Sequence, residues 1–283
     1  GGRPAWLKSA AGWQRMALPA SASMKAGRVF PLAAPNGAND VLIWGGVTDL
    51  PSPATASALA SGLAPTSGAV RLNIANGAWS AVPAKTAAAL PNVLTGAAMC
   101  HGTVSSSPFA WVFGRSAPGA AAQLWRVNAA TGATTVLSDG SGVGPTTVSG
   151  AALLWDSKGH RLLHVASNSG LHVWAWPLVG KPGWSKLVAD VGAASGAVVV
   201  LGDLTIDDPL LAILPVDSGA KPALRRLGLA PQPVLAPVAL TPPAWHAVAH
   251  SVWTPAGAVV SPGPRADGLP VPGLLVWPRA CAP

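Results

Sequence analysis

Two pairs of histidines are the first candidates for chemistry in this sequence. His160 and His164 lie four residues apart in HRLLH, and His246 and His250 lie four apart in HAVAH. On a strand, residues at even spacing share one face, so each pair offers two ligands to a metal ion such as zinc. A metal site needs a third ligand, and the sequence places none at a typical spacing beside either pair. We therefore favour packing histidines over a metal centre.

Three other patterns suggest catalysis at first sight. Cys100 precedes His101, but neighbours on a strand point to opposite faces, which opposes a Cys–His nucleophile. Asp207 and Asp208 are adjacent and indicate a turn rather than a pair of catalytic carboxylates. The glycine-rich segment 140–145, GSGVGP, lacks the lysine and the helix of a phosphate-binding loop. We therefore predict no catalytic residue, no metal and no cofactor.

Trp174 and Trp176 in VWAW share one face of a predicted strand. If exposed, such a pair stacks a sugar ring or a nucleic-acid base; if buried, it packs between sheets. The chain has 13 Trp and no Tyr, so tryptophan is its main large aromatic side chain and packing is the favoured interpretation. The absence of Tyr also excludes sialidase-like hydrolases, which use a Tyr nucleophile.

The composition indicates how such residues are positioned. Half of the 283 residues are hydrophobic and 10% are charged, which is enough apolar material for one large domain. The 32 Gly and 29 Pro are spread along the whole chain. Regularly spaced Gly and Pro are typical of many short strands joined by turns, so we predict a single all-β domain over residues 1–283.

The charge is strongly basic. The chain has 18 Lys plus Arg against ten Asp and no Glu, which gives a formal charge of +8. This balance favours an anionic partner: an acidic protein, an anionic surface or nucleic acid. The adjacent Arg225 and Arg226 are candidate interaction residues, although scattered basic charge without a patch is the alternative.

The start of the chain, its longest uncharged run and its cysteines bear on cellular location and disulfide bonding. The chain begins GGRPAW rather than with Met, which predicts the removal of a signal, a transit peptide or a longer parent segment, and hence a mitochondrial, plastid or secreted location. The longest uncharged run, 227–264, is interrupted by prolines, so we predict no transmembrane segment. Cys100 and Cys281 are too few for a disulfide framework, and the sequence leaves their pairing open.

Two elements recur along the chain. The first is an apolar run that ends at a small residue: VLIWGG at 41–46, AWVFGR at 110–115, LLHVAS at 162–167, VVVLGD at 198–203, and a fainter GAVVSP at 257–262. Several copies follow a strand and a tight turn, which is the signature of a hairpin. The second element places a Trp three residues before an aliphatic side chain in GWQRM (12–16), AWSAV (78–82) and GWSKL (183–187). Units of several strands with a period of about 40–50 residues are typical of propeller blades.

On these residues the chain resembles the kelch-repeat β-propeller family. The resemblance implies four-stranded blades, with glycine after the second strand and Trp on a later strand. Only the first repeat keeps both glycines. The family's copper-radical oxidases need tyrosines, so the resemblance does not extend to that activity. The repeat positions are Gly45, Gly46, Gly114, Gly202, Trp13, Trp79 and Trp184.

We expect about five blades, with six as the alternative. The blades are placed at residues 26–82, 95–137, 147–188, 195–228 and 234–278, and residues 12–18 supply the outer strand of the last blade and close the ring. The interval between Trp184 and the apolar run of the fourth blade is short. It predicts a weak or missing inner strand in that blade, with Leu224 in the place of the outer-strand Trp. We expect a Cβ at Gly45 or Gly46 to meet the backbone of the next blade.

We predict a non-catalytic scaffold or structural subunit with a protein as its partner. The alternatives are a secreted or cell-surface carbohydrate-binding propeller and an enzyme whose active site lies on the propeller loops. The uncharged insertion 50–67 and the long connections between blades leave one side of such a meander, so we expect partner contacts there. Within the insertion the candidate contact residues are Leu50, Ala54, Leu59 and Leu63.

Overall fold

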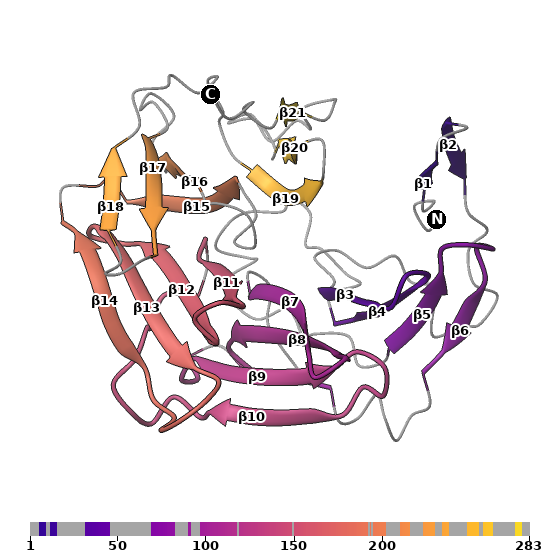
Figure 1. Ribbon diagram of the computed structural model, residues 1–283, viewed down its shortest axis with the longest axis horizontal. Coiled ribbons are helices and arrows are strands. Elements are labelled where there is room, and N and C mark those ends of the chain that lie inside the picture. Colours follow the sequence, from indigo (N-terminus) through magenta and orange to yellow (C-terminus); the bar gives the residue numbers. More distant parts are fainter. Residues whose placement is uncertain are drawn as a thin grey trace. The chain divides into compact units, whose positions relative to one another are not determined.

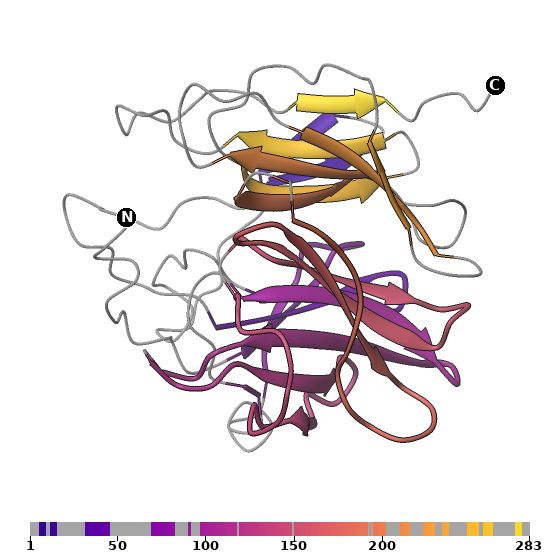
Figure 2. The same ribbon diagram turned by 90° about the vertical axis from the view of Figure 1, so that its left-hand side faces the viewer.

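Every regular element that the structure describes is a β-strand (Figures 1 and 2). The computed structural model describes residues 6–9, 12–15, 32–45, 69–82, 90–91, 97–117, 119–148, 150–191, 193, 195–201, 210–215, 223–229, 234–237, 248–254, 257–262 and 275–278. The all-β prediction is confirmed. In these residues no helix is long and apolar enough to span a membrane. The chain divides into two compact units, Gly1–Gly142 and Val143–Pro283.

The first unit contains two four-stranded antiparallel sheets, in each of which every strand pairs with the one before it. The first sheet consists of β3 (Leu32–Asn36), β4 (Asp40–Trp44), β5 (Ala69–Asn73) and β6 (Trp79–Ala81). The second sheet consists of β7 (Ala98–Val104), β8 (Ser107–Gly114), β9 (Gln123–Asn128) and β10 (Thr134–Ser138).

The second unit repeats this plan. The third sheet consists of β11 (Ala152–Asp156), β12 (Arg161–Ser167), β13 (Leu171–Pro177) and β14 (Ser185–Asp190). The fourth sheet consists of β15 (Gly196–Leu201), β16 (Leu210–Pro215), β17 (Ala223–Gly228) and β18 (Val234–Pro237). The pair Ser167–Gly196 joins β12 to β15. A three-stranded sheet follows, with β19 (Val248–Thr254), β20 (Gly257–Pro262) and β21 (Leu275–Pro278).

This succession of antiparallel four-stranded sheets is propeller-like. The strand expected to close the ring, β2 (Gly12–Arg15), pairs with β1 (Trp6–Ser9), and Trp13 stands opposite Lys8. The number of blades and the closure by residues 12–18 stay predictions.

The order of strands in the fourth sheet differs from the order that the sequence predicted. The run VVVL, expected as a second strand, forms β15 and is the first strand of four. Leu224 therefore lies on the third strand, β17, rather than on an outer strand. Residues 234–237, expected in the fifth blade, form β18 and pair with β17. The reason is that β15 is the first strand of this sheet and pairs directly with β16. Each later strand therefore takes a position one place further from β15 than the sequence predicted.

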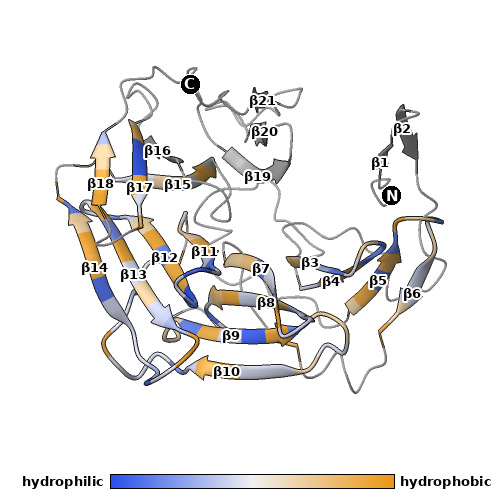
Figure 3. Ribbon diagram, in the orientation of Figure 1, coloured by the Kyte–Doolittle hydropathy of each residue, from blue (hydrophilic) through white to orange (hydrophobic). Residues whose placement is uncertain are grey.

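The central strands are buried on both faces, as the apolar runs predict. Residues 110–113 of β8 and 162–165 of β12 are all at most 1% exposed. Figure 3 shows the hydrophobic stretches of these strands in orange. In the first unit the core includes Trp44, Val112 and Trp125. In the second unit one face of the third sheet packs against the fourth, and this core includes Leu163, Val173, Val198, Ile213 and Leu227.

The glycine at the end of the first apolar run is needed for its backbone conformation. Gly45 is buried and has φ +67°, a region that favours glycine. A Cβ added to Gly45 would meet no atom within 4 Å, so the expected crowding by a neighbouring backbone is wrong for this residue. Gly114 is buried at the end of β8, where it pairs with Gln123. Gly46 and Gly202 lie outside the described residues.

Candidate interaction surface

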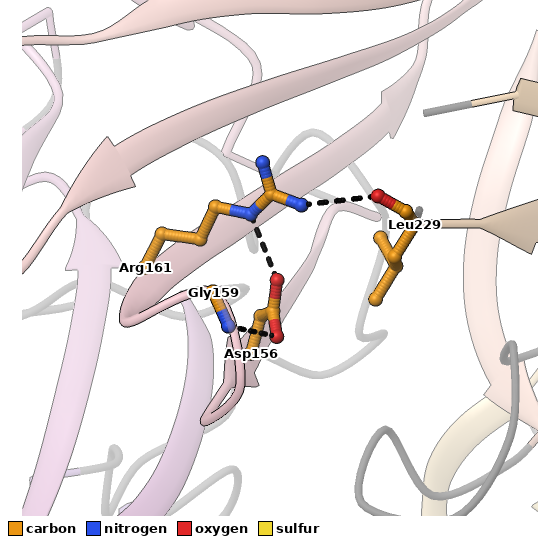
Figure 4. A network of polar contacts seen from close by, with 4 residues as sticks. All are labelled: Asp156, Gly159, Arg161 and Leu229. Carbon is orange, nitrogen blue, oxygen red and sulfur yellow. Dashed lines mark hydrogen bonds and ion pairs between the residues drawn. The ribbon is translucent and has the colours of Figure 1, made fainter. Parts of the chain in front are cut away.

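The most deeply buried carboxylate among the described residues holds a turn together. Asp156 ends β11 and is 3% exposed. Its Oδ1 accepts a hydrogen bond from the Gly159 amide (2.8 Å), and its Oδ2 forms an ion pair with Arg161 Nε (2.8 Å). Figure 4 shows the same guanidinium reaching the Leu229 carbonyl after β17, at 3.5 Å. One carboxylate thus fixes the β11–β12 turn and orients an arginine that joins the third sheet to the fourth.

Two further arginines join consecutive sheets in the same way. Arg225 on β17 forms an ion pair with Asp190 on β14 (2.9 Å) and donates to the Leu224 carbonyl. In the first unit Arg71 on β5 donates from Nη2 to the Ala130 carbonyl, in the turn between β9 and β10. Arg225, a predicted interaction residue, is therefore engaged inside the protein. Its neighbour Arg226 is exposed.

Equivalent asparagines shape two turns of the first unit. Asn73 Oδ1 accepts hydrogen bonds from the amides of Ala75 and Asn76, and Asn128 Oδ1 accepts from Ala130 and Thr131. In each turn a glycine amide returns to the asparagine carbonyl. Sequence analysis missed these residues, although the segments RLNIANGA and RVNAATGA carry the signal. Such Asx turns satisfy backbone donors that the strands leave unpaired.

His164 is a core residue and not a ligand. It is 0% exposed, and its Nε2 donates to the Thr147 carbonyl (2.9 Å). Its ring lies edge-on to Trp184, with centroids 6.2 Å apart, and Trp184 in turn meets Trp176 at 5.4 Å. Burial lowers the pKa of His164 to about 4, although the hydrogen bond to Thr147 acts in the opposite direction. His160 is exposed in the preceding turn, so the structure does not bring this pair together as a site.

Trp174 and Trp176 have different surroundings despite sharing a face. Trp176 is 7% exposed and packs on Trp184, as the packing interpretation predicts. Trp174 is half-buried, and the Lys186 Nζ lies 5.9 Å from the centroid of its ring. Trp174 and Lys186 are partners across β13 and β14. Burial, and then the charge of Lys186, lowers the pKa of His172 on the same strand. The exposed Lys186 therefore lies over one face of the Trp174 ring, the predicted stacking residue that is only half-buried.

The remaining chemical candidates form no site in the described residues. Cys100 is a free thiol whose pKa is raised by burial, which keeps it protonated at neutral pH. Burial lowers the pKa of its neighbour His101. The segment 140–145 is a loop, in which Gly144 lies against Trp184. No group of three or more metal-ligating side chains occurs in the part of the chain that the structure describes. Outside that part lie Asp207, Asp208, His246, Cys281 and the insertion residues Leu50, Ala54, Leu59 and Leu63.

The repeat tryptophans lie near outer strands. Trp79 is half-buried on β6 and stands opposite Leu72 of β5. Trp184 is half-buried just before β14. The corresponding position in the second sheet is Thr134 at the start of β10.

Comparisons with known proteins identify a fold and no family. No family model matches the sequence, and no curated protein is significantly similar to it. Among solved structures, that of YjhT is similar to this chain, with a TM-score of 0.58 and 10% sequence identity, over 98% of this chain and 88% of YjhT. At this identity the likeness concerns the fold alone.

Proposed function

We propose that the chain is a non-catalytic, kelch-like propeller that acts as a protein-interaction scaffold or as a structural subunit of a larger assembly. The observation that supports this proposal most strongly is the use of the reactive side chains inside the protein. Asp156 and Asp190 form ion pairs with arginines. His164 is buried and hydrogen-bonded, and burial keeps Cys100 protonated. The aspartates thus orient arginines that join sheets, and His164 and Cys100 are packed inside the protein.

The charge that remains at the surface supports an acidic partner. Among the described side chains Lys158, Lys181, Lys186 and Arg226 are exposed, against a single exposed carboxylate, Asp139. Attraction of a negatively charged surface accelerates encounter and fixes orientation, which suits a scaffold. The predicted role of the insertion 50–67 stays part of this proposal.

The carbohydrate-binding alternative has less support. Sugar rings stack on exposed aromatic faces, but Trp176 is buried against Trp184, and Lys186 lies over the ring of Trp174.

Native mass spectrometry of the chain isolated from its source, together with a glycan array of the purified chain, tests the proposal. We expect a defined complex with another protein at fixed stoichiometry and no specific glycan signal. A monomer that binds a defined glycan would contradict the scaffold and establish the carbohydrate-binding alternative.

A further inference from the structure

We propose that one end of the third sheet binds an acidic segment of the partner protein. This surface, the lysine end, consists of the exposed side chains of Lys158, Lys181 and Lys186, with Trp174 beside Lys186. The inference rests on the proposed scaffold function and names the partner's chemistry. The lysine end is the opposite end of the sheet from the one at which the long loops were expected to bind a partner.

The order of the strands brings the three lysines to one end. Lys158 lies in the turn between β11 and β12, and Lys181 lies in the loop between β13 and β14. In an antiparallel meander these two connections leave the same end. The Leu178 amide donates to the His160 carbonyl (2.8 Å), which ties the loop to the turn. Lys186 is the second residue of β14 and therefore lies next to that end.

The lysine end carries positive charge that the sheet itself does not neutralise. Residues 150–191 are all described and contain two carboxylates. Asp156 is paired with Arg161, and Asp190 lies at the other end of β14, paired with Arg225. Three of the chain's seven lysines fall in this stretch, and all three are exposed. The local surface thus favours a negatively charged occupant.

The chemistry favours an acidic peptide over nucleic acid. Lysine ammonium groups are compact point charges, which match carboxylates without the bidentate geometry of arginine. Base stacking needs a free aromatic face, but Trp174 already carries Lys186 over its ring, and the nearby Trp184 packs against His164 and Trp176. An extended segment of about six residues spans roughly 20 Å, which is enough to cross four strands about 4.8 Å apart.

The test is binding of a fluorescein-labelled peptide of alternating Glu and Ser, about 12 residues long, to the full chain by fluorescence anisotropy at low and physiological salt. A single-stranded oligonucleotide of equal charge is the second probe. We expect each of Lys158→Ala, Lys181→Ala and Lys186→Ala to weaken peptide binding about threefold, and the triple variant roughly 30-fold. Arg226→Ala removes one exposed charge from the fourth sheet and should change the affinity less than about twofold. If the triple variant melts earlier, the three single Lys→Gln variants replace it.

Undiminished peptide binding by the triple variant, or an equal loss with Arg226→Ala, would overturn the assignment of the lysine end. Preferential binding of the oligonucleotide would overturn the acidic-peptide partner. These outcomes are separate from the scaffold function. If the triple variant keeps its native protein partner, the scaffold stands and the site is elsewhere. If the peptide binds at the lysine end but the source yields no complex, the site stands and the scaffold function fails.

Discussion

The first and second sheets (β3–β10) are held differently from the third and fourth sheets (β11–β18). Between the first two, Arg71 donates to the Ala130 carbonyl, and the turns are shaped by neutral asparagines. Between the third and fourth, the ion pair of Asp190 with Arg225 accompanies the apolar core, and Arg161, oriented by its ion pair with Asp156 inside the third sheet, reaches the Leu229 carbonyl. In the first region an arginine therefore meets a backbone carbonyl, whereas in the second region arginines are paired with carboxylates.

This difference bears on how the excess of basic residues is distributed between ion pairs and the surface. In the second region Asp156 and Asp190 are paired with partly buried arginines, and Lys158, Lys181 and Lys186 are exposed. A partly buried ion pair is worth little in net stability, but removal of one partner leaves an uncompensated charge. We therefore expect the second region to be the more sensitive to loss of single charges.

The largest effect is expected from Asp156→Ala. The substitution leaves the largely buried Arg161 without its partner and the Gly159 amide without its acceptor, so we expect a loss of about 4 kcal/mol in the free energy of unfolding. Urea denaturation followed by tryptophan fluorescence measures it. The matched control is Asp139→Ala in the first region, where an exposed carboxylate is bonded only to Ser141, and a much smaller change is expected. Equal losses would remove the distinction between the regions.

The second effect is a dependence on pH. The pKa of His164 is about 4 in the folded chain and about 6.5 when exposed, so the folded state binds the proton less well than the unfolded state. Stability is full above pH 6.5 and falls as the pH is lowered toward 4, by about 3 kcal/mol in all. His164→Gln does not titrate and should flatten this profile in urea denaturation at several pH values. A profile unchanged by His164→Gln would show that the buried histidine is not responsible.

The third effect compares glycines. A Cβ at Gly144 would lie 2.6 Å from Trp184 Cδ1, so Gly144→Ala should cost about 2 kcal/mol through overpacking. Gly45→Ala meets no atom but must adopt φ +67°, which costs about 1 kcal/mol. Gly142→Ala is the control, since it has open space and no positive φ. Melting temperatures in the order Gly142→Ala, Gly45→Ala, Gly144→Ala from highest to lowest are expected, and a reversed order of the last two would refute the packing of Trp184.

The smallest effect sharpens the description of the first region. Asn73→Ala and Asn128→Ala should each cost about 1 kcal/mol, since each removes an acceptor for two amides. Asn73 Nδ2 also donates to Asp40 Oδ1 (3.0 Å), so Asn73→Asp places two carboxylates together, whereas Asn128→Asp keeps its turn. Thermal melts at neutral pH should show Asn73→Asp as clearly the less stable of the two. Equal melts would mean that the contact with Asp40 is absent in solution.

Local pattern predicts the strands but not their partners. The apolar runs at 41–44, 110–113 and 162–165 form β4, β8 and β12 as expected, because period and turn residues are local properties. The predicted order of strands in the fourth sheet was wrong. An apolar run such as VVVL can form either the first or the second strand of a sheet, and its sequence does not indicate which strand pairs with it.

The candidate site was less predictable than the fold. Trp174 and Trp176 were placed correctly on one face, but which of them is exposed depends on Lys186 and Trp184, which other segments supply. Arg225 looked like a surface charge because its partner Asp190 is distant in sequence. The asparagine turns were visible in the repeated segments, and a search for repeated polar residues would have found them.

The most direct test of the scaffold and of its lysine end is chemical acetylation of the seven lysines, quantified by mass spectrometry in the free chain and in the complex isolated from source. Protection in the complex reports which side chains the partner covers. We predict that the acetylation of Lys158, Lys181 and Lys186 falls several-fold in the complex, while that of Lys221 does not change. Protection confined to other lysines, such as Lys85 in a segment predicted to connect two blades, with Lys158, Lys181 and Lys186 as reactive as in the free chain, would contradict it.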